Sequence, residues 1–374
     1  MKKIFISLLA VAALAACTKS EIAYEAPAEI GFTAVAGNIT KAAVDGNVYP
    51  TDLNMYVNAY VHASTVPSTP DYILNGEFVH RTTKVEGKEV WGGVTSYYWP
   101  NNQTLHFSGF SKSGSFYSLN TAPATTGNGL TAVYNPSDDL LTINNYSPGT
   151  ESASGANDLM WFRSTKYTAS NGYDKSTKSV PVEMYHTCSW ITFMVQGDAA
   201  TSASASEYKV TSLKINGIDL TADVKCYGAV NGKTFSKETL SDFVKWENNT
   251  AQTGEYQVNV VSSGVALVGT YTSDTSKTPK NLETGETTNV GGNVVVIPQE
   301  PGTIDIAWTY KSSTGATVSD SATGLSLKLD NNNTLNWVPG KHYVYTITIK
   351  ANEILIAPTP VDWVDDVDHP VTIE

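Results

Sequence analysis

The amino-acid sequence predicts an all-β protein with two β-sandwich domains in tandem and little helix. Hydrophobic residues make up 41% of the chain and charged residues only 16%, and Tyr (20 residues) outnumbers Phe (10). Valine, threonine and tyrosine suit a half-buried pleated surface, and they lie in runs separated by Gly, Pro and Asn. The length of 374 residues is too great for one sandwich and sufficient for two.

Residues 1–17 are predicted to be an export signal. Lys2 and Lys3 precede an apolar run from Ile4 to Leu14, and two alanines then lead to Cys17. A helix that spans a bilayer needs roughly 20 apolar residues, so this shorter run indicates a secretory signal. The ending Leu-Ala-Ala-Cys resembles the bacterial lipobox, which implies that Cys17 is acylated and becomes the first mature residue. The alternative is an ordinary cleaved signal peptide with an incidental cysteine.

The first domain is predicted to span residues 28–179, after a polar tether at 18–27. Its first strand has apolar residues at alternate positions, which share one face. These residues are Ile30, Phe32, Ala34 and Ala36. Further strands are predicted at 54–61, 97–99, 105–110 and 140–143. Short strands at this spacing are typical of a sandwich or a barrel.

The second domain is predicted to span residues 180–374, because the polar stretch at 164–179 cannot fill a core. The run from Val182 to Val195 has two apolar faces and predicts a central strand. A short helix is indicated by Leu240, Phe243 and Val244, spaced i, i+3, i+4. Other strands are predicted at 208–215, 256–261, 294–297, 304–310 and 325–329.

The C-terminal segment alternates strongly. A turn at 337–341 opens a strand at 343–349, and a second strand starts at 354. From residue 361 the odd positions are mostly apolar and the even positions mostly acidic or polar. The apolar ones are Val361, Trp363, Val367, Val371 and Ile373. This pattern predicts a strand that needs an apolar groove, so residues 357–374 are a candidate donor strand for another chain.

The charge and the motifs exclude several functions. A net charge of −12 argues against nucleic acid as a partner and against electrostatic docking on an anionic membrane. The sequence has no Gly-x-Ser-x-Gly or His-Glu-x-x-His motif, and its histidines are scattered singly. Residues 228–234 come close to a phosphate-binding loop but lack its first glycine, which favours a hairpin turn. We therefore expect no enzyme, no metal and no cofactor.

Two cysteines lie beyond the export signal, Cys188 and Cys226. An exported pair could form a disulfide. Both lie in apolar, strand-like contexts, so two separately buried thiols are at least as well supported.

The densest group of aromatic residues consists of Trp91, Tyr97, Tyr98 and Trp99. Exposed aromatic rings can stack on sugar rings, so these residues are a candidate glycan-binding platform. Core packing explains them about as well, because large aromatic side chains dominate sandwich interiors.

A series of short stretches follows in order along the chain. They are Leu14–Cys17, Glu29–Thr33, Thr40–Ala42, Tyr98–Pro100, Leu105–Phe110, Asp158–Met160, His186–Phe193, Trp337–Ile347 and Trp363. In this order they resemble the fimbrillin family of Bacteroidetes, in its Mfa-like branch of type V pilus subunits. The resemblance covers nearly the whole chain, and the order of the motifs carries it.

The resemblance implies two transthyretin-like sandwich domains in an outer-membrane lipoprotein of the cell surface. It also implies adhesion, assembly with other pilin subunits into a fimbria as shaft, tip or anchor, and contact with host or bacterial surfaces. A trypsin-like protease would remove the first strand. Where the family commonly has Arg before Ala, this chain has Lys41 before Ala42. A strictly Arg-specific protease is therefore not expected to cut here.

Removal of the first strand would have a physical consequence. It would uncover an apolar trough lined by unpaired backbone groups, which another chain must fill. The segment from Val361 could fill it, with Val361, Trp363 and Val367 as plugs. Head-to-tail insertion does not close on itself and makes a filament. The alternatives are that both end segments are ordinary intramolecular strands, or that the protein is a surface glycan-binding lipoprotein.

Overall fold

A computed structural model gives the arrangement of the strands. It describes residues 28–36, 49–61, 73–85, 88–100, 104–112, 131–135, 137–149, 158–164, 179–197, 208–248, 253–261, 264–266, 279–285, 287, 294–311, 314–327, 335–349 and 354–362. Regular structure in these ranges is almost entirely β, with a single short helix, α2 (Leu240–Phe243). The predictions of an all-β protein and of a short helix at this place are confirmed. No helix within the described ranges is long and apolar enough to cross a lipid bilayer.

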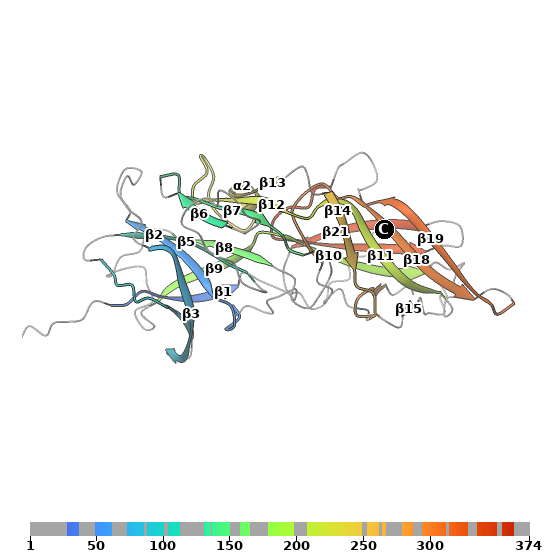
Figure 1. Ribbon diagram of the computed structural model, residues 1–374, viewed down its shortest axis with the longest axis horizontal. Helices are drawn as coiled ribbons and strands as arrows, with labels where there is room; N and C mark the ends of the chain where they lie inside the picture. The colour runs from blue at the N-terminus through green and yellow to red at the C-terminus, as the bar shows by residue number, and fades with distance from the viewer. Residues whose placement is uncertain are drawn as a thin grey trace, which may run out of the picture.

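The first half of the chain forms a closed barrel, drawn from blue to green in Figure 1. Its strand order is β1-β4-β3-β2-β5-β8-β9. The bounds are β1 (Gly31–Ala36), β2 (Met55–Val61), β3 (Ile73–Val85), β4 (Lys88–Gly93), β5 (Leu105–Lys112), β8 (Leu159–Arg163) and β9 (Val180–His186). Neighbours run antiparallel except at the closure, where β1 runs parallel to β9.

A four-stranded antiparallel sheet covers the outside of this barrel. Its order is β13-β12-β7-β6, and its bounds are β6 (Thr131–Asn135), β7 (Leu140–Tyr146), β12 (Ala222–Tyr227) and β13 (Val244–Asn248). Some barrel strands therefore have two buried faces, because alternate residues point to opposite sides. In β8, Met160 and Phe162 pack in the barrel core, whereas Leu159 and Trp161 pack against the four-stranded sheet.

The polar stretch at 164–179 is not a boundary between sheets. β9 follows it and closes the barrel, and β12 pairs with β7 from the first half of the chain. Polar composition shows where a core cannot be filled, but it does not show which strands pair. The division into domains 28–179 and 180–374 stays a prediction, while the sheets are shared across it.

The remaining strands form two facing sheets, drawn from yellow-green to red in Figure 1. One has the order β16-β10-β20-β21, with β17 also on β10, and the other has the order β14-β11-β18-β19, with β15 also on β11. The bounds are β10 (Ser189–Gly197), β11 (Lys209–Asp219), β14 (Thr253–Val258), β15 (Val265–Ala266), β16 (Lys280–Asn281), β17 (Val294–Val296), β18 (Thr303–Lys311), β19 (Thr317–Ser326), β20 (Lys341–Ile349) and β21 (Ile354–Asp362).

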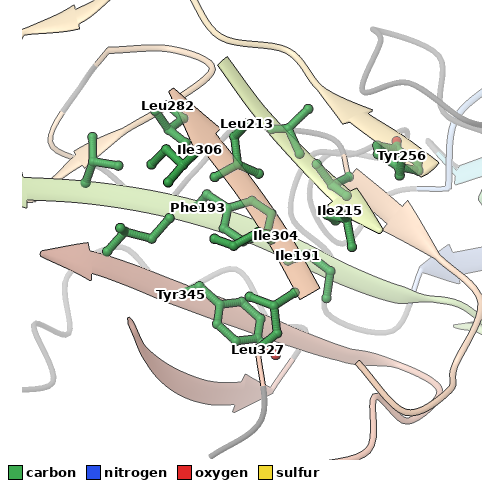
Figure 2. Packing of buried hydrophobic residues seen from close by; sticks show 14 of the residues in the cluster. Ile191, Phe193, Leu213, Ile215, Tyr256, Leu282, Ile304, Ile306, Leu327 and Tyr345 are labelled. Carbon is green, nitrogen blue, oxygen red and sulfur yellow. The ribbon is translucent and has the colours of Figure 1, made fainter. Parts of the chain in front are cut away.

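Apolar side chains from the two sheets interlock between them, as Figure 2 shows. Alternation within each strand produces this core, because every second residue of β10, β20, β11 and β18 faces inward. The labelled residues are Ile191, Phe193, Leu213, Ile215, Tyr256, Leu282, Ile304, Ile306, Leu327 and Tyr345.

The run at 182–195, predicted as one central strand, forms two strands in different sheets. β9 ends at His186 in the barrel, and β10 begins at Ser189 in the C-terminal sheet. Between them, the Thr187 amide and hydroxyl both donate to the Leu159 carbonyl, at 2.9 and 2.8 Å. The prediction of a single strand is wrong, because this anchored residue turns the chain. Each half is nevertheless an interior strand of its own sheet.

The turn predicted at residues 228–234 is confirmed, and the structure decides between the two alternatives left open for the cysteines. Residues 228–234 contain a turn in which the Lys233 amide donates to the Val230 carbonyl at 3.1 Å, with Gly232 at a φ of 72°. Cys188 and Cys226 are both buried and both free thiols.

Candidate functional site

The strand β1 closes the barrel between β4 and β9. Along β9 it pairs in parallel from Phe32 opposite Val180 to Ala36 opposite Met184. Along β4 it pairs only briefly, with Phe32 opposite Trp91 and the residue before it opposite Gly92. β1 therefore has neighbours on both sides at Phe32 and on one side beyond it.

The residues just before β1 are paired with a different segment. The Ile30 amide donates to the Tyr97 carbonyl at 2.7 Å, and the Trp99 amide donates to the Ala28 carbonyl at 3.0 Å. An isolated bridge joins Glu29 to Tyr98. The slot that β1 occupies is thus built from β4, β9 and residues 97–99.

The inner face of β1 lies in the barrel core, as the alternation in the sequence predicts. Ile30, Phe32 and Ala34 are buried, and Phe32 has no exposed surface (0%). Its ring lies 4.8 Å from that of Phe78, 5.3 Å from that of Phe107 and 5.9 Å from that of Phe162, measured between centroids. These three rings come from β3, β5 and β8, so one side chain of β1 connects three other strands across the barrel.

The rest of the barrel is paired without β1. β4 is held on its other side by β3, and β9 is held by β8. The remaining order β4-β3-β2-β5-β8-β9 is continuous. Loss of β1 would leave a six-stranded sheet with a trough along its inner face and an unpaired edge on β9.

The C-terminal candidate segment is only partly described. β21 runs antiparallel to β20, with Val361 opposite His342, and it stands last in its sheet order. The other candidate residues Trp363, Val367, Val371 and Ile373 lie outside the described residues. Cys17, Lys41 and Ala42 also lie outside them. Of the first-strand candidates, Ala36 is placed by its backbone pairing.

The aromatic group at 91–99 does not form a sugar-binding platform. Trp91 and Trp99 are buried in the barrel core, with exposed fractions of 0% and 4%, and Trp91 Nε1 donates to the Leu53 carbonyl at 3.0 Å. Tyr97 stacks on Phe78, with centroids 5.8 Å apart. Tyr98 alone among the four is largely exposed, at 47%. The glycan interpretation fails here because the tryptophan faces are used for packing.

One buried polar pair was not predicted from the sequence. Asp158 Oδ2 lies in contact with His186 Nδ1, and both side chains are buried. Next to them, Trp246 Nε1 donates to the Thr187 carbonyl at 2.8 Å. The pair fastens β8 to β9 where the chain leaves the barrel. A histidine and an aspartate so far apart in sequence gave no local signal of this contact.

No group of three or more His, Cys, Asp or Glu side chains within the described ranges gathers closely enough to hold a metal ion. On the side of the barrel core the slot is lined by aliphatic and aromatic side chains, and on the other face Ser179 Oγ donates to Thr33 Oγ1 of β1. The arrangement is suited to holding a β-strand and not to holding a small charged ligand.

Comparisons with known proteins identify the family of the chain. The sequence profile of the fimbrillin-like family matches residues 40–363. A fimbrial protein from Bacteroides vulgatus shares the fold, with a TM-score of 0.53 at 12% identity over 89% of this chain and 99% of that one. Candidate cell adhesion proteins from Bacteroides ovatus and Bacteroides uniformis align with TM-scores of 0.47 and 0.45, at 11% and 14% identity, over 92% and 90% of this chain and 100% and 98% of theirs. Curated proteins give no match. Because the family profile spans most of its length, the chain belongs to the fimbrillin-like family.

Proposed function

We propose that the protein is a subunit of a cell-surface fimbria that polymerises by strand exchange. Removal of β1 would open its slot, and the C-terminal strand of a neighbouring subunit would fill it. The observation that carries this proposal is the place of β1, whose inner face lies in the core while the other barrel strands pair without it. Membership in the fimbrillin-like family supports a structural and adhesive role and not a catalytic one.

An emptied slot would be energetically unfavourable until a new strand fills it. The rings of Phe78, Phe107 and Phe162 would lose the ring of Phe32 that lies between them. Truncation of one such buried ring costs about 3–5 kcal/mol, and an apolar trough of several residues costs more. The β9 edge would also lose its backbone partners. A strand with apolar residues at alternate positions relieves both defects at once.

The C-terminal segment has the required pattern. Its apolar residues at odd positions are Val361, Trp363, Val367, Val371 and Ile373. In strand addition, main-chain hydrogen bonds supply affinity and alternate side chains fill pockets. Each subunit would give its tail to one neighbour and receive the tail of another. Such a head-to-tail contact has no closing symmetry and therefore extends into a filament.

The N-terminal segment would carry both the signal for membrane anchoring and the cleavage site that starts assembly. Acylation of Cys17 would anchor the precursor in the outer membrane, and a trypsin-like protease would cut between Lys41 and Ala42. The resulting partners are other pilin subunits, the membrane through the lipid, and the surfaces of host or bacterial cells. Shaft, tip and anchor positions all fit this scheme.

N-terminal sequencing of fimbrial material sheared from cells that produce the protein tests the proposal. We expect polymeric subunits that begin at Ala42. The variant Lys41→Gln should block both the cut and the polymer, whereas the matched variant Lys41→Arg should preserve both, because trypsin-like proteases accept either basic residue. Polymers in which every subunit keeps an acylated Cys17 would overturn the proposal.

A further inference from the structure

The strand β21 contains two prolines two residues apart, Pro358 opposite Tyr345 and Pro360 opposite Tyr343. In an antiparallel ladder, successive residues point their N–H and C=O groups alternately toward the partner strand and away from it. A proline has no N–H, so within a ladder it occupies a position that points away from the partner. Because Pro358 and Pro360 are two residues apart, their backbone groups point to the same side of β21. Both prolines can therefore point away from β20 at once.

The positions of the two prolines show which residues of β21 face β20 and which face the outer edge. Ala357, Thr359 and Val361 lie between and beside the prolines, so their backbone groups face β20. Residues 354, 356, 358, 360 and 362 face the other edge. On that outer edge the donors at 358 and 360 are absent, which leaves no N–H between Ile356 and Asp362. At the usual rise per residue this gap is about 20 Å long.

We infer that Pro358 and Pro360 close the outer edge of β21 against strand addition, so that a second copy of this chain cannot extend the C-terminal sheet there. Among the described residues β21 is the last strand of its sheet, and such edges invite pairing with other chains unless they are blunted. Proline at these outward positions removes the N–H donors that another strand would use, and it leaves the pairing with β20 intact. The closed edge prevents lateral association of copies through this sheet.

The same prolines bear on strand exchange, and this step rests on the proposed function. At Phe32 the slot has a neighbour on each side, Trp91 and Val180. A strand taken from residues 357–361 offers N–H groups along one edge only. Residues 361–369, which lie between Pro360 and Pro370, have no such restriction. The inserted strand is therefore the part of the tail that follows Pro360, and residues 354–360 remain on β20.

Amide hydrogen exchange at single-residue resolution, on the intact chain from residue 18, tests the closed edge. We expect slow exchange at Ala357, Thr359 and Val361 and fast exchange at Ile356 and Asp362. Slow exchange at Ile356 and Asp362 would overturn the inference, because it would show a partner on the outer edge. The intact chain keeps β1, so this result does not depend on whether strand exchange occurs.

A pair of variants tests the role of the prolines directly. The double variant Pro358→Val/Pro360→Val restores two outward donors and should self-associate about tenfold more tightly than the parent chain, as measured by sedimentation. The control Thr359→Val adds the same kind of side chain but leaves the outer edge unchanged, and it should stay monomeric. Equal association of the two variants, or no change in the double variant, would overturn the inference.

Discussion

Phe32 of β1 meets Phe78 of β3 edge to face, with ring centroids 4.8 Å apart and planes at 83°. β1 and β3 are not neighbours in the barrel, since β4 lies between them. The contact therefore crosses the interior and does not follow the hydrogen-bonded ladder. It makes β1 a part of the core as well as a part of the barrel wall.

Phe32→Ala should lower the free energy of unfolding of the intact chain by about 3–5 kcal/mol, because it leaves a cavity among three aromatic rings. Thr33→Ala is the matched control on the other face of the same strand, and it should cost about 1 kcal/mol or less. Chemical denaturation measures both. Similar losses for the two variants would mean that β1 is held by its backbone and not by its inner face.

Asp158→Ala should destabilise the protein by about 3 kcal/mol, because it leaves the buried imidazole of His186 without its acidic partner. The double variant Asp158→Leu/His186→Phe should recover part of this loss, since an apolar pair needs no partner in a buried site. A double-mutant cycle by denaturation measures the coupling. Additive effects of the two single changes would contradict a direct interaction.

His342 should make the protein sensitive to acid. Burial lowers the pKa of His342 from its ordinary value near 6.5 to about 3, so in acid the unfolded chain takes up a proton that the folded chain excludes. This contribution is fully present above pH 6.5 and is lost as the pH falls toward 3. The slope is roughly 1.4 kcal/mol per pH unit in the middle of that window.

The variant His342→Phe should flatten this dependence between pH 6 and pH 4. Phenylalanine keeps a ring against Trp190, whose centroid lies 3.8 Å from that of His342, but it cannot be protonated. The hydrogen bond of His342 Nε2 with Thr192 Oγ1 is lost, so the absolute stability falls as well. The slope against pH is the informative quantity. An unchanged slope would assign the acid sensitivity to other groups.

Cys188 and Cys226 should resist alkylation in the folded protein at neutral pH. Burial raises the pKa of both thiols well above their ordinary range, and the nearby Asp158 carboxylate adds to the effect at Cys188. Because the thiolate is the reactive form, neither thiol should be modified by iodoacetamide until the chain unfolds. Mass spectrometry of native and denatured samples counts the modified residues. A chain that gains no label after denaturation without a reductant would contradict free thiols.

The sequence was most informative where alternation is strong. The inner face of β1 and the strands β2, β5 and β20 follow directly from apolar residues at every second position. β19 was largely missed because most of its residues are Ser, Thr, Asp or Gly and most are exposed, so no alternating apolar pattern marks it. The extended β3–β4 hairpin was missed for a similar reason, since His80 and Arg81 interrupt its apolar residues.

The pairing of strands that lie far apart in the chain could not be predicted from the sequence. Nothing in residues 31–36 shows that they pair in parallel with residues 180–184, and this pairing is what makes a barrel. The break at Thr187 depends on a contact with Leu159, which is equally non-local. The burial of Trp91 and Trp99 follows from this closure, because the inside of the barrel is where their rings lie.

A competition for the slot of β1 tests strand exchange between subunits directly. The folded chain, cut after Lys41 and freed of its N-terminal strand, is mixed with a labelled peptide of residues 28–41, and then with an unlabelled peptide of residues 361–374. We expect the C-terminal peptide to displace the labelled one from a single site, and Trp363→Asp in the peptide to weaken this displacement. Binding of the C-terminal peptide beside the labelled one, or retention of the labelled peptide at every concentration, would contradict strand exchange.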